Sequence, residues 1–192
     1  AEPYAERASA ADGADNADEA AEAVPEAVEA AADTADVEPS GAEPAELADL
    51  AEPAGPAEAA PREAFKERLK YYAGQFLIAF DGDTPIGFID GFVSDDEILT
   101  DEMFADASLH NPNGAWQMIF GLNTMPEYRN RGVGGRLIEA FIELAREETR
   151  KGVILTCKAE KIPYYAKFGF VNEGESESDH GDAKWYQMRI RL

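Results

Sequence analysis

One short segment of the chain combines residues that suit the binding of an anion. Residues 125–136 read MPEYRNRGVGGR, with three glycines and three arginines. Glycines remove the Cβ atoms where a ligand would have to touch the backbone. A helix that begins there supplies unpaired N–H groups and the positive end of its dipole, and arginines add forked donors for phosphate. The candidate anion-binding residues are Arg129, Asn130, Arg131, Gly132, Val133, Gly134, Gly135 and Arg136.

Two familiar phosphate loops do not fit this segment. A P-loop needs a Lys-Ser/Thr pair after its last glycine, whereas Gly135 is followed by Arg136 and Leu137. The Gly-x-Gly-x-x-Gly pattern of dinucleotide-binding folds is also absent. The arginines do reverse the sign of the charge locally, because the chain as a whole carries a net charge of −22. The pattern alone fits an anion-binding loop and a plain glycine-rich turn equally well.

Few other residues suggest acid–base or nucleophilic chemistry. The histidines are His110 and His180, and each fits a base, a substrate contact or simple exposure in a loop. The single cysteine, Cys157, ends an apolar run with no Cys–His pairing evident, which favours a buried core residue over a nucleophile. One cysteine also excludes an intrachain disulfide and paired-cysteine metal sites, so no metal site is expected. Asp90 and the acidic stretch 95–102 fit either attraction of a cationic amine or a solvated loop.

The glycine–arginine segment lies between a predicted strand and a predicted helix. Residues 116–124 form an apolar strand pattern, and Gly121 inside it suggests a β-bulge or the close approach of another group. Residues 133–148 carry an apolar stripe at helical spacing, and residues 153–157 form a buried type of strand. Strand, helix and strand in this order predict a right-handed crossover between two parallel strands.

The remaining elements are predicted to complete a mixed sheet. A helix is predicted from residue 62, and residues 75–93 read as an antiparallel hairpin around a turn at 81–85. Short helices are predicted over 101–107 and 162–167, and a final strand over 185–192. Together these elements predict an α+β fold, with a mixed, mostly antiparallel central sheet flanked by helices.

The charge is distributed unevenly along the 192 residues. Residues 1–60 hold 17 acidic residues and one basic residue, whereas the other 132 residues hold 22 acidic and 16 basic ones. Low hydrophobicity with high net charge predicts that residues 1–36 form an acidic, Ala/Glu-rich disordered tail and that the domain spans 37–192. An acidic arm for a basic partner and a helix lying on the domain are the competing interpretations. A first strand at 37–39 and a helix at 46–50 are also predicted.

The composition also argues against several classes of protein. The acidic excess argues against nucleic-acid binding, which needs clustered Lys and Arg. No apolar run approaches the ~20 residues that a membrane span needs, and no signal-peptide core is present. With a single cysteine, the chain is expected to work in a reducing compartment, the cytoplasm. The oligomeric state is unknown from these features.

Two motifs together resemble the GNAT superfamily of N-acetyltransferases. Arg129, Gly132 and Gly134, with Pro126 upstream, match the superfamily's Arg/Gln-x-x-Gly-x-Gly/Ala pyrophosphate loop. Residues 164–170, YYAKFGF, match its second signature in order and spacing. The resemblance covers residues 62–192 well and 37–61 poorly. It implies the GNAT fold, with a splayed pair of parallel strands, and acetyl-CoA (coenzyme A) as the cofactor.

Within the superfamily the sequence is most similar to the arylalkylamine (serotonin) N-acetyltransferase branch and its bacterial relatives. The similarity lies in residues 87–110, 155–158 and 162–165. It implies direct transfer of an acetyl group from acetyl-CoA to the primary amine of a small substrate. The alternatives are acetylation of a protein or peptide amino group, and a catalytically idle acyl-CoA-binding domain that acts as an interaction module.

The resemblance also implies roles for residues outside the loop. Backbone groups of Leu122, Asn123 and Thr124 are expected to hold the pantetheine arm, while the glycine–arginine loop holds the pyrophosphate. Tyr165 matches the general-acid tyrosine, which protonates the departing thiolate.

The base is where the sequence departs from the animal enzymes of this branch. Those enzymes use two histidines on the strand before the loop, and the matching positions here are Met118 and Phe120, which cannot accept a proton. His180 and His110 are therefore the candidate bases, beside a chain of water molecules.

Overall fold

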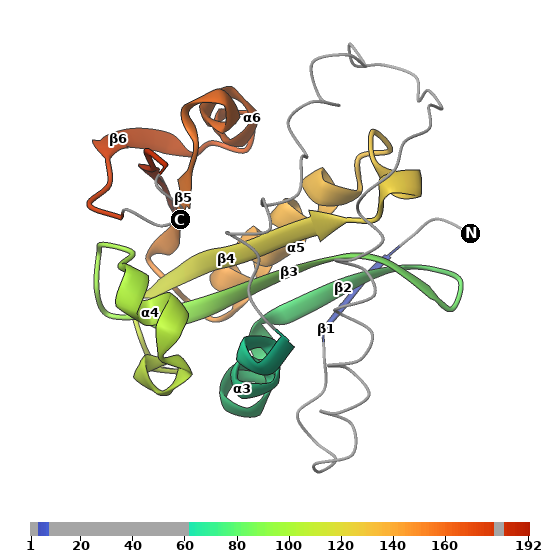
Figure 1. The fold of residues 1–192 in the computed structure, drawn as a ribbon, viewed down its shortest axis with the longest axis horizontal. Coiled ribbons are helices and arrows are strands. Elements are labelled where there is room, and N and C mark those ends of the chain that lie inside the picture. The colour runs from blue at the N-terminus through green and yellow to red at the C-terminus, as the bar shows by residue number, and fades with distance from the viewer. Residues whose placement is uncertain (1–3, 8–61, 179–182) are drawn as a thin grey trace.

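The computed structural model describes residues 4–7, 62–178 and 183–192. In this part of the chain seven strands form one sheet, in the order β1-β2-β3-β4-β5-β7-β6 (Figure 1). The strands are β1 (Tyr4–Arg7), β2 (Phe76–Asp81), β3 (Thr84–Ser94), β4 (Trp116–Thr124), β5 (Gly152–Cys157), β6 (Val171–Glu175) and β7 (Tyr186–Arg191). The α-helices are α3 (Arg62–Tyr72), α4 (Asp101–Ala105), α5 (Val133–Glu147) and α6 (Ile162–Ala166). Short 3₁₀ helices are η3 (Ala73–Gln75), η4 (Ala107–Leu109), η5 (Pro126–Tyr128) and η6 (Ala159–Lys161).

The direction of the strands follows the predicted topology. Strands β4 and β5 are parallel and are joined by the crossover helix α5. The other neighbouring pairs in the described sheet are antiparallel. The predicted α+β fold, with a mixed and mostly antiparallel sheet, is therefore confirmed.

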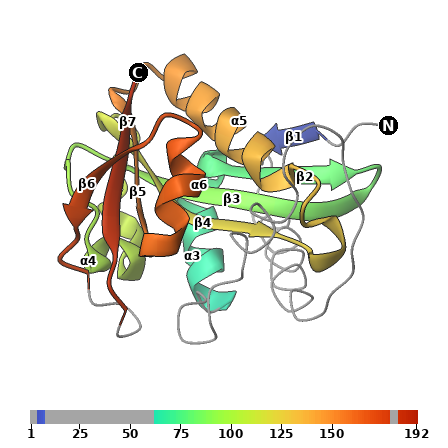
Figure 2. The ribbon, with the colours of Figure 1, turned by 90° about the horizontal axis from the view of Figure 1, so that it is seen from above.

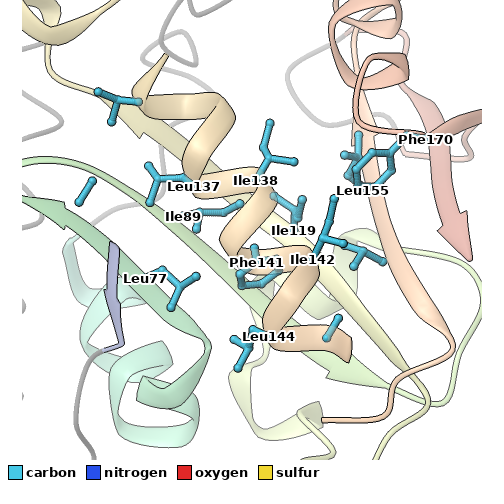
Figure 3. Close-up of a cluster of buried hydrophobic side chains, with 14 of the residues drawn as sticks. Leu77, Ile89, Ile119, Leu137, Ile138, Phe141, Ile142, Leu144, Leu155 and Phe170 are labelled. Atoms are coloured by element: carbon cyan, nitrogen blue, oxygen red, sulfur yellow. The ribbon is translucent and has the colours of Figure 1, made fainter. Parts of the chain in front are cut away.

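Helix α5 covers one face of the sheet, and α3 lies on the opposite side (Figure 2). Leu137, Ile138 and Phe141 of α5 are completely buried, as the apolar stripe in the sequence predicts. Figure 3 shows this side of α5 directed toward Ile89 on β3 and Leu155 on β5. Because α5 packs on strands from both sides of the parallel pair, it holds the two halves of the sheet together.

The α3 face of the sheet is rich in aromatic side chains. Phe65 of α3 meets Phe88 of β3 edge to face, with ring centroids 5.7 Å apart. Tyr72 of α3 meets Phe92 of β3 in the same way at 5.8 Å. Met118 of β4 is fully buried in this cluster. This face is therefore an aromatic layer that runs from α3 across β3 to β4.

Two edge strands were not predicted from the sequence. β1 pairs with β2 at one edge, so the expectation of a solvated tail is wrong for residues 4–7. β6 pairs with β7 at the other edge, although most of its side chains are exposed. Neither sequence, YAER for β1 nor VNEGE for β6, carries the apolar alternation that predicts a strand. The expected tail beyond residue 7, the strand at 37–39 and the helix at 46–50 lie outside the described residues.

Candidate cofactor and acetyl-transfer site

The parallel strands β4 and β5 stay paired over only part of their length. Four residue pairs join them, from Trp116 with Gly152 to Ile119 with Leu155. β4 continues to Thr124 along β3 without a partner on its β5 side in the described chain. Figure 1 shows the two strands running in different directions beyond their paired part. The splayed parallel pair that the sequence resemblance implies is therefore present.

A bulge in β4 lies where the two strands separate. Asp90 of β3 is opposite Gly121, and Gly91 is opposite Ile119, so Phe120 is the extra residue. The bulge that Gly121 predicted from the sequence is confirmed. A bulge turns a strand and increases its local twist. It therefore directs the end of β4 away from β5.

The loop after β4 has the backbone geometry of an anion-binding turn. Asn130 and Gly132 have left-handed backbone angles, with φ of 60° and 76°. Gly132 is the residue before α5, and no side chain caps the N–H groups of the helix there. The first bond of the helix runs from Arg136 N to Gly132 O, at 3.1 Å. The N–H groups of the first turn therefore remain available to an anion.

The arginines of the loop have different contacts. Arg129 donates from Nε to the carbonyl of Thr124 at 3.3 Å, which ties the loop to the end of β4. The Arg131 guanidinium lies 5.1 Å from the ring centre of Tyr128. Arg136 donates to the carbonyl of Arg131 at 3.4 Å, and its side chain is exposed. Arg129 thus stabilises the loop, while the charged side chains of Arg131 and Arg136 remain exposed beside the start of α5.

Gly134 links the loop to the second motif of the sequence. A Cβ atom placed on Gly134 would lie 3.2 Å from the hydroxyl of Tyr164 and 3.7 Å from Oγ1 of Thr124. The end of β4, the start of α5 and helix α6 therefore meet at this glycine. The structure brings together the candidate pantetheine-binding strand, the candidate phosphate loop and the tyrosine motif.

The two tyrosines of α6 pack edge to face, with ring centroids 5.3 Å apart. Burial raises the pKa of Tyr165 above its ordinary value of 10.0, and Cys157 and Tyr164 raise it further. Burial also raises the pKa of Tyr164, to about 12. Both phenols are therefore fully protonated at neutral pH, as a proton donor must be.

Cys157 is a buried core residue. Its side chain is 4% exposed, and its Sγ lies 3.5 Å from Sδ of Met188. Burial raises the pKa of the thiol to about 12, so the nucleophilic thiolate is not populated near neutral pH. This environment agrees with the interpretation of Cys157 as a core cysteine.

His110 is held away from the gap between β4 and β5. Its Nδ1 accepts a hydrogen bond from the backbone N–H of Val93 at 3.1 Å, next to the paired end of β4. Its ring packs against Tyr72 and Phe92, at centroid distances of 4.8 and 5.5 Å. The hydrogen bond occupies the lone pair that a base would use, so His110 is not part of the chemistry proposed below. His180, the other candidate base, lies outside the described residues.

The environment of His110 predicts a loss of stability in acid. Burial, aided by the charge of Arg150, lowers the pKa of His110 from 6.5 to about 4. Below pH 6.5 the unfolded chain therefore binds a proton that the folded chain binds only near pH 4. The contribution of His110 to stability is complete above 6.5 and is lost as the pH falls toward 4. His110→Gln, which keeps an acceptor for Val93 but cannot be charged, should show a shallower fall in Tm over this range. Parallel Tm curves for the two proteins would contradict this assignment.

The buried pair of Arg68 and Asp90 was not expected from the sequence. Arg68 Nη1 lies 3.0 Å from Asp90 Oδ2, and the two side chains are 6% and 0% exposed. Burial raises the pKa of Asp90, and Arg68 opposes this rise. Asp90 lies inside β3 and is completely buried, so the interpretation of this residue as part of a solvated loop is wrong. Its partner on α3 is 22 residues away in the chain, and the sequence pattern alone did not indicate this contact.

Two negative findings apply to the described residues alone. None of the helices there is both long and apolar enough to span a bilayer. No group of three or more His, Cys, Asp and Glu side chains there is arranged to hold a metal ion.

The fold and the loop match a known family of enzymes. Residues 44–170 match the model of the acetyltransferase (GNAT) family, and the chain belongs to that family. The loading GNATL domain of CurA from Lyngbya majuscula superposes with a TM-score of 0.62 at 14% identity, over 76% of this chain and 89% of that one. Ard1 from Thermoplasma volcanium gives a TM-score of 0.57 at 20% identity, over 79% and 94%. At these identities the solved structures establish the GNAT fold.

Sequence relatives with assigned functions match parts of the chain. Serotonin N-acetyltransferase from Mesocricetus auratus is 27% identical over 108 residues, which are 56% of this chain and 51% of that enzyme. A probable glucosamine 6-phosphate N-acetyltransferase from Oryza sativa subsp. japonica is 46% identical over 46 residues, 24% of this chain and 28% of that protein. The chain thus spans about half, or less, of the length of these relatives.

Proposed function

We propose that this protein is an N-acetyltransferase that transfers the acetyl group of acetyl-CoA to the primary amine of a small substrate. The observation that carries the proposal is the meeting of three parts at Gly134. The unpaired edge of β4, the uncapped start of α5 and Tyr164 of α6 surround one point. Membership of the acetyltransferase family and the named functions of the relatives support the same reaction.

The chain holds the cofactor through backbone groups at two places. Leu122, Asn123 and Thr124, on the unpaired edge of β4, bind the amides of the pantetheine arm as an added strand would. The N–H groups from Arg131 to Gly135, which precede the first hydrogen bond of α5, bind the pyrophosphate at the positive end of the helix. The exposed charges of Arg131 and Arg136 add to this attraction. The gap between β4 and β5 would then receive the thioester.

The transfer itself needs three proton movements. The free amine attacks the thioester carbon, the C–S bond breaks, and the thiolate takes the proton of Tyr165. A phenol with an ordinary pKa of about 10 is a weaker acid than a thiol of about 8.5, and burial raises the pKa of Tyr165 further, so this donation is uphill and depends on position. The amine must lose a proton before attack, and the group that takes it is His180 or a chain of water molecules. The second proton, from the new amide, returns to the phenolate of Tyr165.

Two aromatic side chains near the bulge of β4 favour a small aromatic amine as the acceptor. On the α3 face of the sheet, Phe104 and Phe120 stack with their ring centroids 4.3 Å apart and remain partly exposed. Such rings suit the aromatic or apolar part of an arylalkylamine. The serotonin-acetylating relative supports this choice of acceptor, and a peptide amino group is the competing acceptor.

A thiol-release assay with acetyl-CoA and a panel of amines tests the proposal. The panel holds arylalkylamines, alkylamines, an amino sugar phosphate and a peptide with a free N-terminus. We expect the highest kcat/KM with an arylalkylamine. A preference for the peptide would identify the competing acceptor. Binding of acetyl-CoA without turnover of any amine would instead favour the catalytically idle binding domain.

A further inference from the structure

The buried pair of Arg68 and Asp90 touches both residues of the β4 bulge. Asp90 lies opposite Gly121, and a Cβ atom on Gly121 would overlap its Oδ1. The Arg68 guanidinium lies 5.1 Å from the ring centre of Phe120, the extra residue of the bulge. The carboxylate of the ion pair thus lies beside Gly121, and its guanidinium lies beside Phe120.

Further contacts anchor this arrangement to the aromatic layer. Phe120 stacks on Phe92 of β3 at 5.2 Å and on Phe104 of α4 at 4.3 Å. Arg68 also lies 5.6 Å from the ring of Phe65 on its own helix. The bulge is therefore held between β3, α3 and α4, on the face opposite α5.

A buried ion pair such as Arg68–Asp90 contributes little net free energy to the stability of a fold. Removing two charges from water costs several kcal/mol per ion, and well-packed apolar residues often replace such a pair without loss of stability. Asp90 Oδ1 is buried and has no hydrogen-bond partner among the described residues. A role beyond stability explains why charges stand at this point.

We propose that Arg68 and Asp90 are positioning residues for the cofactor, because they set the bulge that turns the end of β4 away from β5. Asp90 occupies the space beside Gly121, and Arg68 holds Phe120 on the α3 face. The peptide groups of Leu122 and Asn123, which follow the bulge, then remain free on their β5 side to receive the pantetheine arm. This inference rests on the proposed use of acetyl-CoA.

The test compares the binding of whole acetyl-CoA with the binding of its nucleotide half alone. Acetyl-CoA needs the gap and the phosphate loop, whereas adenosine 3′,5′-bisphosphate has no pantetheine arm and needs only the loop side. In Arg68→Met and Asp90→Asn we expect acetyl-CoA to bind about tenfold more weakly, the effect of losing one or two hydrogen bonds. The affinity for the bisphosphate should stay unchanged. Arg68→Lys keeps the charge without the planar fork, and gives a milder form of the same effect if the other variants fold poorly.

Arg189→Met is the matched control. Arg189 is also buried and paired, with Nε 2.8 Å from Glu173, but it lies beside Trp116 at the paired end of β4. Its loss should lower Tm without changing the ratio of the two affinities. Equal weakening of both probes, or no weakening, in the Arg68 and Asp90 variants would overturn the inference. If the unsubstituted protein bound neither probe, the proposed function would fail, and the inference with it.

Discussion

Replacing Gly134 with glutamate should abolish the binding of acetyl-CoA. A side chain at this position begins 3.2 Å from the Tyr164 hydroxyl and 3.7 Å from Thr124 Oγ1, so it has to enter the space above the start of α5. The proposed occupant of that space is the pyrophosphate, which the glutamate both displaces and repels. We expect no detectable binding in calorimetry at concentrations that saturate the unsubstituted protein.

A second variant separates the effect of a side chain at position 134 from the effect of one added negative charge on the protein. Asn113 lies in an exposed loop before the opposite end of β4, and Asn113→Glu adds the same charge near the C-terminal end of α5, away from the start of the helix. That variant should bind acetyl-CoA as the unsubstituted protein does. Wild-type affinity in a folded Gly134→Glu protein would show that the loop does not hold the phosphates.

Removing the hydroxyl of Tyr165 should slow turnover with little effect on cofactor binding. Tyr165→Phe keeps the ring, which packs against Tyr164 and Phe170 at 5.3 and 6.0 Å, and removes only the proton donor. We expect kcat to fall by roughly 10²–10³-fold, the scale for one acid–base group. Because the pKa of Tyr165 is raised above 10.0, its ionisation should not limit kcat below about pH 10. Steady-state kinetics over pH and calorimetry with acetyl-CoA measure both quantities.

Tyr164→Phe is the natural comparison, since its hydroxyl lies at the phosphate loop. Its removal should raise the KM for acetyl-CoA by a few-fold and change kcat little, which is the reverse of the Tyr165 effect. A core role for Tyr165 predicts that any loss of rate follows the loss of Tm. An unchanged kcat in Tyr165→Phe would remove this residue from the proposed chemistry.

The elements that carry the loop were predictable because their signals are local. The apolar stripe of α5 and the glycine inside β4 can each be recognised from a few neighbouring residues in the sequence. The helix was expected at 133–148 and runs from Val133 to Glu147. Such periodic patterns arise directly from burial of one face, so they survive in a single sequence.

Other parts of the site depend on contacts that no local pattern reports. Arg68 follows Glu67 and reads as one more charged residue of an amphipathic helix, yet it is buried because α3 lies over Asp90. His110 was considered as a base, but its lone pair is bound to Val93 once η4 turns back toward β3. In both cases the partner is distant in the sequence, and the chemistry of the residue depends on that partner.

The short seam between β4 and β5 also has a mechanical consequence. The hydrogen-bonded sheet is continuous from β1 to β6 only through the four residue pairs that end at Ile119 and Leu155. A change in the angle between its two halves therefore strains fewer backbone pairs than the same bend at β2–β3, β3–β4 or β5–β7, where the ladders are longer. Helix α5, packed on both halves, limits how far they can turn. Among the internal seams of the described sheet, the one between β4 and β5 therefore resists a change of angle mainly through the packing of α5 rather than through backbone pairing.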